Sequence, residues 1–176
     1  MFKVALIFPG SFRTLVEKME QRLKGFDFQV ITIYSETPID EQEKRRVLQG
    51  VDVYVTGGLE RITADALEET TKLRLIQRFG AGYENVDCIA AARKGIYVAN
   101  IPGANADSVA DLTMGLILAL VRHIVKADNL LRKGTWRFWI GHELVGKVLG
   151  IPGLGAIGKA VAFRAQAHGM TIIAHD

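Results

Sequence analysis

The spacing of apolar and polar positions alternates along the first part of the chain between strand-like runs and helix-like periods. Short apolar runs typical of strands covered on both faces are Lys3 to Phe8, Phe28 to Tyr34, Val51 to Thr56, Leu73 to Phe79 and Ile96 to Ala99. Apolar residues at helical spacing between the first two runs are Phe12, Leu15, Val16, Met19 and Leu23. Further helices are predicted from Thr37-Pro38 to Gln49, after Thr63 as N-cap, and from Val86 to Lys94. Five strands alternating with helices predict an α/β fold with a doubly wound parallel sheet over residues 1–100.

The loop Gly80-Ala81-Gly82 follows the fourth predicted strand. Ligands of doubly wound sheets lie beyond the carboxyl ends of the strands. We therefore expect a ligand contact first at this loop, and a glycine-rich turn without a ligand is the alternative.

A long apolar helix is predicted from Asn105 to about Arg132, ending at Gly134. It is apolar on most of its circumference, and such a helix needs partners on several sides. We expect it to link two domains over residues 101–146 and to pack against a second subunit. The aromatic residues that follow it, Trp136, Phe138 and Trp139, form an arm.

The last stretch, residues 147–176, has the pattern of strand, glycine loop, helix and strand. Gly153, Gly155 and Gly158 have G-x-G-x-x-G spacing: the first allows a tight turn, the second lets a pyrophosphate approach the backbone, and the third lets the helix lie close to the strand. The free N–H groups at the start of the helix, on Ala156 and Ile157, then face the phosphate. The alternative is a glycine-rich turn as found in any α/β protein.

Asp176 ends the second strand of this unit, where a carboxylate accepts hydrogen bonds from the ribose hydroxyls of a dinucleotide. It would repel a 2′-phosphate, so the pattern favours NAD over NADP. Pro152 is discordant, because it has no N–H for a central strand. We expect a weakened or distorted loop after it.

Composition narrows the class of protein. The net charge of +3 arises after residue 100, where 8 basic and 5 acidic side chains occur. This excess suits a nucleotide and is too small and scattered for nucleic acid. The single cysteine, Cys88, has no disulfide partner within the chain, and no metal-ligand spacing surrounds it. With no run of about 20 apolar residues and no signal peptide in MFKVALIFPGSF, we expect no membrane span and a cytoplasmic location.

Several motifs in order resemble one family, the D-isomer-specific 2-hydroxyacid dehydrogenases, and within it the phosphoglycerate dehydrogenase and hydroxypyruvate reductase branch. The segments that carry the resemblance are LIQRFGAGYENVD, ANIPGANADSVADLTMGLILAL, GTWRFWIGHELVGK and the glycine-loop unit to Asp176. The resemblance implies a flavodoxin-like substrate domain, a linking helix and the first strand–helix–strand unit of a Rossmann domain. It also implies hydride transfer between NAD(H) and a 2-hydroxy or 2-oxo acid, and a homodimer formed through the long helix and the arm.

The resemblance also assigns site residues. Ala81 and Gly82 belong to the substrate loop, with N–H groups that reach the substrate carboxylate, and Ala81 also borders the nicotinamide. Ala156 and Ile157 lie on the pyrophosphate, although the family usually has arginine at position 156, so a side-chain contact is lost there. Arg78 either adds positive charge to the substrate loop or, more simply, forms a surface salt bridge. Trp136 and Phe138 are candidate interface residues, with core packing as the alternative.

The family uses a histidine as general acid/base, a carboxylate that orients it and an arginine that holds the substrate. The resemblance places all three beyond Asp176, and the four histidines, His123, His142, His168 and His175, do not match the catalytic position. His123 and His168 are expected at the surface or at helix ends. We therefore assign no catalytic residue and no metal ligand, and expect a truncated or deliberately shortened chain that is inactive alone.

Two rival hypotheses remain open at the level of the sequence. One is a non-catalytic nucleotide-sensing or assembly module of the same fold. The other is a fragment that binds no ligand. An incomplete Rossmann sheet leaves a strand edge unpaired, so we expect such a chain to be marginally stable or to recruit another copy.

Overall fold

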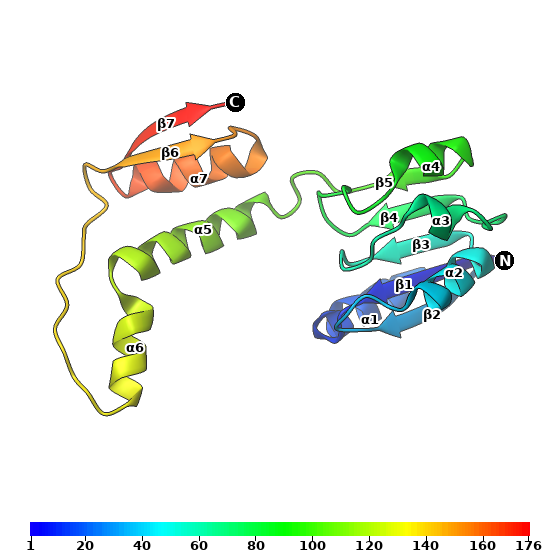
Figure 1. Cartoon of the computed structure of the whole chain (residues 1–176), viewed down its shortest axis with the longest axis horizontal. Helices are drawn as coiled ribbons and strands as arrows, with labels where there is room; N and C mark the ends of the chain where they lie inside the picture. The colour runs from blue at the N-terminus through cyan, green and yellow to red at the C-terminus, as the bar shows by residue number, and fades with distance from the viewer. The chain divides into compact units, whose positions relative to one another are not determined.

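The computed structural model describes all residues 1–176 and divides them into two compact units, Met1–Pro102 and Gly103–Asp176 (Figure 1). The first unit holds a five-stranded parallel sheet with the strand order β2-β1-β3-β4-β5. Its strands are β1 (Phe2–Phe8), β2 (Phe28–Tyr34), β3 (Val53–Thr56), β4 (Leu75–Arg78) and β5 (Tyr97–Ala99). Its helices are the 3₁₀ turn η1 (Gly10–Phe12), α1 (Arg13–Leu23), α2 (Glu41–Gly50), α3 (Ala64–Leu67) and α4 (Cys88–Arg93). The predicted α/β fold is confirmed.

Both faces of this sheet are apolar because helices cover both. One face packs with α2, α3 and α4 in a buried cluster that includes Ala5, Ile7, Tyr54 and Ile76. The alternate strand residues pack with α1 in a second cluster that includes Val4, Leu6, Phe8 and Val55. This explains why the strands are continuous apolar runs.

The ends of the helices follow local capping signals, with one correction. Thr63 caps α3 as predicted, since its hydroxyl accepts from the N–H of Ala66 at 3.3 Å. The predicted cap at Thr37 is wrong, because α2 begins later and Asp40 accepts from the N–H of Glu43 at 2.9 Å. Asp40 competes better for this position because acidic residues of the first turn, Glu41 and Glu43, follow it directly.

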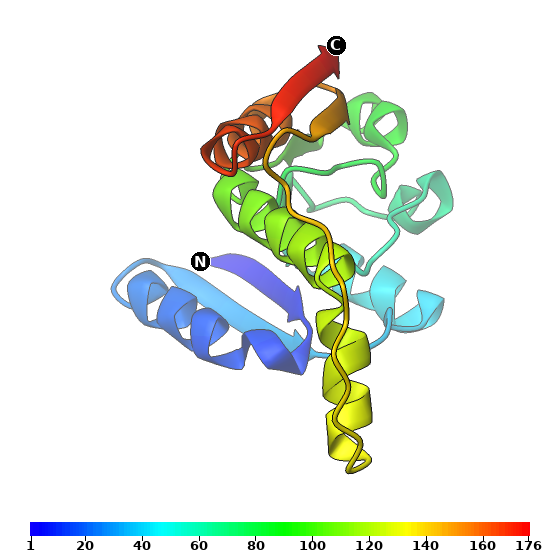
Figure 2. The same cartoon turned by 90° about the vertical axis from the view of Figure 1, so that its left-hand side faces the viewer.

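The second unit contains α5 (Ala106–Val121), α6 (Ile124–Arg132), β6 (Val148–Pro152), α7 (Ala156–Ala167) and β7 (Thr171–His175). Strands β6 and β7 form a two-stranded parallel sheet. Apolar side chains from α5, β6 and α7 form its buried cluster, with Ala110, Met114, Ile151, Val161 and Ala165 among them. Figures 1 and 2 show the extended stretch that runs from the end of α6 back to β6.

The single long helix predicted from Asn105 to Arg132 is wrong. The chain forms two helices, bent by 64° at a break around His123, which has a left-handed φ of 57°. The expected stop at Gly134 is confirmed, as this glycine follows α6 with a φ of 75°. No single helix is long and apolar enough to cross a membrane; α5 and α6 pass that test of length and composition only as a bent pair.

Candidate nucleotide and substrate sites

The glycine loop between β6 and α7 has the geometry of a tight turn. Gly153 has a φ of 100°, a backbone angle that residues other than glycine rarely adopt. A Cβ added at Gly158 would lie 2.1 Å from the carbonyl oxygen of Gly153, so the start of α7 packs directly on the turn. A Cβ at Gly155 would meet no atom within 4 Å. The loop therefore has no room for a side chain at Gly158, where it packs against the helix, but has empty space beside Gly155.

The first N–H groups of α7 are available to an anion. The first helical hydrogen bond joins the N–H of Lys159 to the carbonyl of Gly155 at 2.9 Å, so the N–H groups of Ala156 and Ile157 precede it. The N-cap, Gly155, has no side chain that could satisfy them. The positive end of the helix dipole adds to their attraction for a phosphate.

Asp176 is held against the glycine loop, since its Oδ1 accepts from the N–H of Leu154 at 2.9 Å. Its other carboxylate oxygen makes no hydrogen bond or ion pair within the chain, and is available for a ribose hydroxyl. Glycine loop, helix start and carboxylate thus fit a dinucleotide.

The distortion expected at Pro152 is not seen in the pairing of the strands. Pro152 pairs with His175, and the next N–H, of Gly153, donates to the carbonyl of His175 at 2.6 Å. Backbone groups of a strand point alternately to its two edges. The proline nitrogen therefore faces the edge of β6 away from β7, which has no partner strand in the two-stranded sheet.

The loop after β4 is fixed through three consecutive carbonyl groups. The N–H of Ile101 donates to Gly80 O at 2.8 Å, and the Asn100 side chain donates to Ala81 O at 2.6 Å. Arg78 donates from Nε to Gly82 O at 3.2 Å. The N–H groups of Ala81 and Gly82 make no hydrogen bond within the chain. This arrangement leaves donors without acceptors at the carboxyl end of the sheet.

The surface salt bridge expected for Arg78 is wrong. Its side chain is 6% exposed, and no carboxylate lies within 4.0 Å of it. Its Nη1 atom is buried and makes no hydrogen bond. The residue ends β4 in register with Thr56 of β3, so its side chain lies on the same face of the sheet as Tyr54 and Ile76, the face that α2, α3 and α4 cover.

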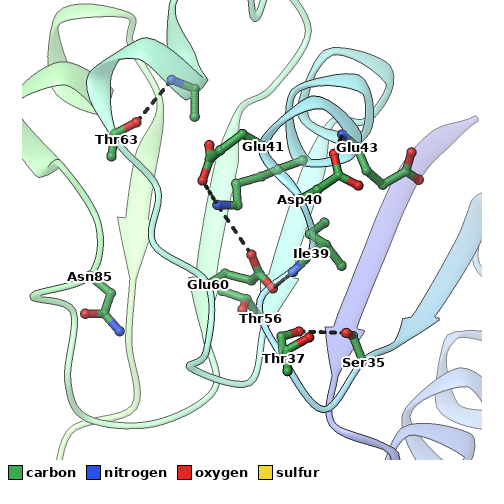
Figure 3. Close-up of polar contacts among 12 residues, drawn as sticks. Ser35, Thr37, Ile39, Asp40, Glu41, Glu43, Thr56, Glu60, Thr63 and Asn85 are labelled. Atoms are coloured by element: carbon green, nitrogen blue, oxygen red, sulfur yellow. Dashed lines mark hydrogen bonds and ion pairs between the residues drawn. The ribbon is translucent and has the colours of Figure 1, made fainter.

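Sequence reasoning missed two groups near this edge of the sheet. Asn100 directly follows β5, and a polar residue at the carboxyl end of a predicted strand was the available signal. Lys44 of α2 is 1% exposed, and its Nζ lies 2.6 Å from Glu41 Oε1 and 3.6 Å from Glu60 Oε2. Figure 3 labels the two carboxylates and marks these contacts with dashed lines. Glu60 Oε1 also accepts from the N–H of Ile39 at 3.0 Å. These contacts join the loop after β3 to α2. They could not be predicted from the sequence, because one lysine on a largely polar helix resembles an ordinary surface residue.

None of the four histidines forms an ion pair with a carboxylate. His168 caps the end of α7 and is exposed, and His123 lies at the break between helices with its ring 5.9 Å from that of Trp139. The expectation that both lie at helix ends is confirmed. No three His, Cys, Asp or Glu side chains are close enough to hold a metal ion.

Two of the three arm residues lie at the surface of the second unit, and the third, Trp139, is half-buried. Trp136 is 73% and Phe138 86% exposed, so core packing within the chain is excluded for both. Exposed apolar side chains of α5 and α6 accompany them: Leu112, Leu116, Leu120 and Ile124. Large exposed apolar side chains that gather in one patch are typical of interaction surfaces.

Comparisons with known proteins confirm the resemblance noted in the sequence. Residues 11–175 match the family model of the D-isomer specific 2-hydroxyacid dehydrogenase catalytic domain. The hydroxypyruvate reductase of Thermotoga maritima is 46% identical over 140 residues, which are 78% of this chain and 46% of that protein. The D-3-phosphoglycerate dehydrogenase of Methanocaldococcus jannaschii is 44% identical over 142 residues, covering 80% of this chain and 27% of that one.

Solved structures agree with this. A protein from Thermus thermophilus has a TM-score of 0.87 at 30% identity, with 98% of this chain and 55% of that chain covered. A structure described as an acyclic imino acid reductase in complex with NADPH and D-Arg has a TM-score of 0.80 at 25% identity, with 98% and 55% covered. The chain thus spans about half the length, or less, of the relatives it matches.

Proposed function

Since the chain belongs to the D-isomer specific 2-hydroxyacid dehydrogenase family, we propose that it supplies the nucleotide loop and the substrate-carboxylate loop of an NAD-dependent oxidoreductase. When bound, the nicotinamide would exchange a hydride with C2 of a small 2-hydroxy or 2-oxo acid. The observation that carries the proposal is the glycine loop, which is closed at Gly158, open at Gly155 and held by Asp176.

The nucleotide would be held by main-chain groups and one carboxylate. The N–H groups of Ala156 and Ile157 would bind the pyrophosphate, and the open space at Gly155 would admit it. The free oxygen of Asp176 would accept from the ribose hydroxyls and repel a 2′-phosphate, which favours NAD over NADP. The contact of Ala81 with the nicotinamide stays a prediction.

The substrate carboxylate would bind the loop after β4. Ala81 and Gly82 present N–H groups without acceptors, and the buried guanidinium of Arg78 has no carboxylate partner. Both features favour an anion. The names of the relatives, hydroxypyruvate reductase, phosphoglycerate dehydrogenase and glyoxylate reductase, support a small 2-oxo or 2-hydroxy acid.

We also propose that the 176 residues do not turn over by themselves. General acid/base catalysis by histidine in this family depends on a carboxylate that orients the ring, and none of the four histidines has such a partner here. A second copy of the chain would cover the apolar surface of α5, α6 and the arm, with Trp136 and Phe138 in the interface.

The experiment that tests the nucleotide site is a titration of the purified chain with NADH, followed by fluorescence or calorimetry. Saturable binding is expected. Gly155→Val should abolish it, because the added side chain occupies the space left for the pyrophosphate. Asp176→Ala should weaken it about tenfold or more, as expected for losing hydrogen bonds to a charged group, and should narrow the preference for NADH over NADPH.

A matched control is Asp128→Ala, which removes an exposed carboxylate of α6 that pairs with Arg132 at 2.9 Å. It should leave NADH binding unchanged. A folded chain that ignores NADH would overturn the proposal for the nucleotide loop. Oxidation of NADH by the pure chain with glyoxylate or hydroxypyruvate would instead refute its inactivity alone.

A further inference from the structure

We infer that Asn100 and Arg78 are positioning residues that hold three consecutive peptide N–H groups ready for the substrate carboxylate. This rests on the proposed function of the loop after β4. Neither side chain is required to touch the substrate in this role. Each acts through a carbonyl group of the loop, at Ala81 O and Gly82 O respectively.

The argument begins with the planarity of the peptide bond. In a trans peptide the carbonyl of one residue and the N–H of the next point in opposite directions. Anchoring Gly80 O to the N–H of Ile101 therefore fixes the N–H of Ala81. Anchoring Ala81 O to Asn100 fixes the N–H of Gly82 in the same way.

The third peptide of the series depends on Arg78. Its Nε–H donates to Gly82 O, which fixes the N–H of Tyr83. All three donors to the carbonyls come from the ends of β4 and β5 or the residues just after, so the carbonyls are drawn towards the sheet. The N–H groups of residues 81, 82 and 83 turn away from it, and none of them finds an acceptor within the chain. Successive N–H groups left free in this way form a concave site for an anion.

The environment of the guanidinium supports an anion more than a structural ion pair. Arg78 is buried, its Nη1 makes no hydrogen bond, and no carboxylate lies within ion-pair distance. The exposed carboxylate of Glu84 also lies beside this loop, since a Cβ added at Gly82 would meet its Oε2 at 2.7 Å. Glu84 opposes a bound anion, so the net attraction depends on the anchored N–H groups and on Arg78.

The test is a titration of the ¹⁵N-labelled 176-residue chain with sodium glyoxylate against matched sodium chloride, followed by the backbone amide resonances. In the wild-type chain we expect saturable shifts at residues 81, 82 and 83. Asn100→Ala should weaken the affinity about three- to tenfold, the loss expected for one hydrogen bond. Arg78→Met should weaken it more, and Arg78→Lys should restore part of the loss because it keeps the charge without the Nε–H donor.

The matched control is Gln77→Ala. Gln77 is the neighbour of Arg78 in β4, and its amide donates to the carbonyls of Arg78 and Ala99 but to none of the loop carbonyls. Its removal should leave glyoxylate affinity within about twofold of wild type, because no loop carbonyl is released. The NADH affinity of every variant is measured alongside, since a positioning role in this loop does not alter it.

The outcomes separate the two proposals. Wild-type shifts that survive unchanged in Asn100→Ala and Arg78→Met overturn the positioning role and leave the substrate loop standing. Absence of shifts at 81–83 in a wild-type chain that binds NADH overturns the substrate loop and this inference together, but not the nucleotide site. If Asn100→Ala does not fold, Asn100→Ser, which keeps a shorter donor, should show an intermediate affinity, and wild-type affinity in it would count against the inference.

Discussion

Tyr54 of β3 places a phenol hydroxyl without a hydrogen-bond partner inside the first unit. Its side chain is fully buried, and the phenol oxygen makes no hydrogen bond. Burial, reinforced by the Glu60 carboxylate, raises the pKa of the phenol above its usual value. The neutral phenol is therefore the form that the folded state holds.

We predict that Tyr54→Phe raises the free energy of unfolding at neutral pH by about 1 kcal/mol, because an unpaired buried hydroxyl is removed without a change of shape. The raised pKa also has a consequence at alkaline pH. Above about pH 10 the unfolded chain loses the phenol proton while the folded chain keeps it, so stability falls as pH rises. Denaturant unfolding across this pH range should show that the free energy of unfolding falls less in Tyr54→Phe than in the wild type. An equal fall with pH in both proteins would contradict the raised pKa of the Tyr54 phenol.

At the scale of residues, the glycine loop could be predicted from the sequence, whereas the polar contacts at the carboxyl edge of the sheet could not. Gly153, Gly158 and Asp176 follow a local pattern, so each could be placed from spacing alone. Asn100 follows β5, and only the pairing of β5 with β4 brings its side chain to Ala81 O. Arg78 lies close to Gly82 in the chain, but no local pattern indicates that its side chain is buried and donates to Gly82 O.

At the scale of elements, the contact between α7 and the turn before it depends on the absence of one Cβ. We predict that Gly158→Ala lowers the free energy of unfolding of the second unit by about 3 kcal/mol, because the new methyl group meets the Gly153 carbonyl and the backbone must shift. Thermal or denaturant unfolding measures it.

A second helical glycine provides the control. Gly115 lies in α5, and a Cβ there would meet nothing within 4 Å. Gly115→Ala should therefore raise stability by about 0.5–1 kcal/mol through the loss of chain entropy. Similar effects of the two substitutions would mean that α7 does not pack on the turn as described.

The break between α5 and α6 is the element that the sequence did not predict. The segment around His123 contains neither glycine nor proline, and apolar residues continue through it at Val121, Ile124 and Val125. The helical spacing of apolar residues therefore continues through the break, and it predicted one helix where the structure has two. The stretch after α6 makes contacts at the break. The N–H of His142 donates to Val121 O at 2.9 Å, Lys126 Nζ lies 3.9 Å from the centroid of the Trp139 ring, and the tilted rings of Trp139 and His123 lie 5.9 Å apart. These contacts compensate for the left-handed conformation of His123.

At the scale of the whole molecule, alternating strands and helices were enough to predict the parallel sheet, because βαβ connections allow few topologies. Assembly is a separate question. The exposed apolar residues of α5, α6 and the arm lie on the second unit, and Leu120 is 76% exposed among them.

We predict that Leu120→Glu weakens self-association about 30-fold or more, the effect expected of a buried interface position. Light scattering over a range of protein concentrations measures it. Ile89→Glu, at an equally apolar residue of α4 that is 68% exposed, is the matched control and should leave the mass in solution unchanged. A wild-type chain that is monomeric at all concentrations would exclude the proposed dimer.

The anchoring of the loop after β4 has a consequence for how this protein can diverge. Its fixed points are the carbonyl oxygens of Gly80, Ala81 and Gly82, which every amino acid possesses. The methyl group of Ala81 takes no part in the anchoring, so mutation at this position can change the surface of the loop while the loop keeps its conformation. In the substrate role proposed for this loop, position 81 is thus one where single substitutions can alter the preference for an acid without loss of the anchoring.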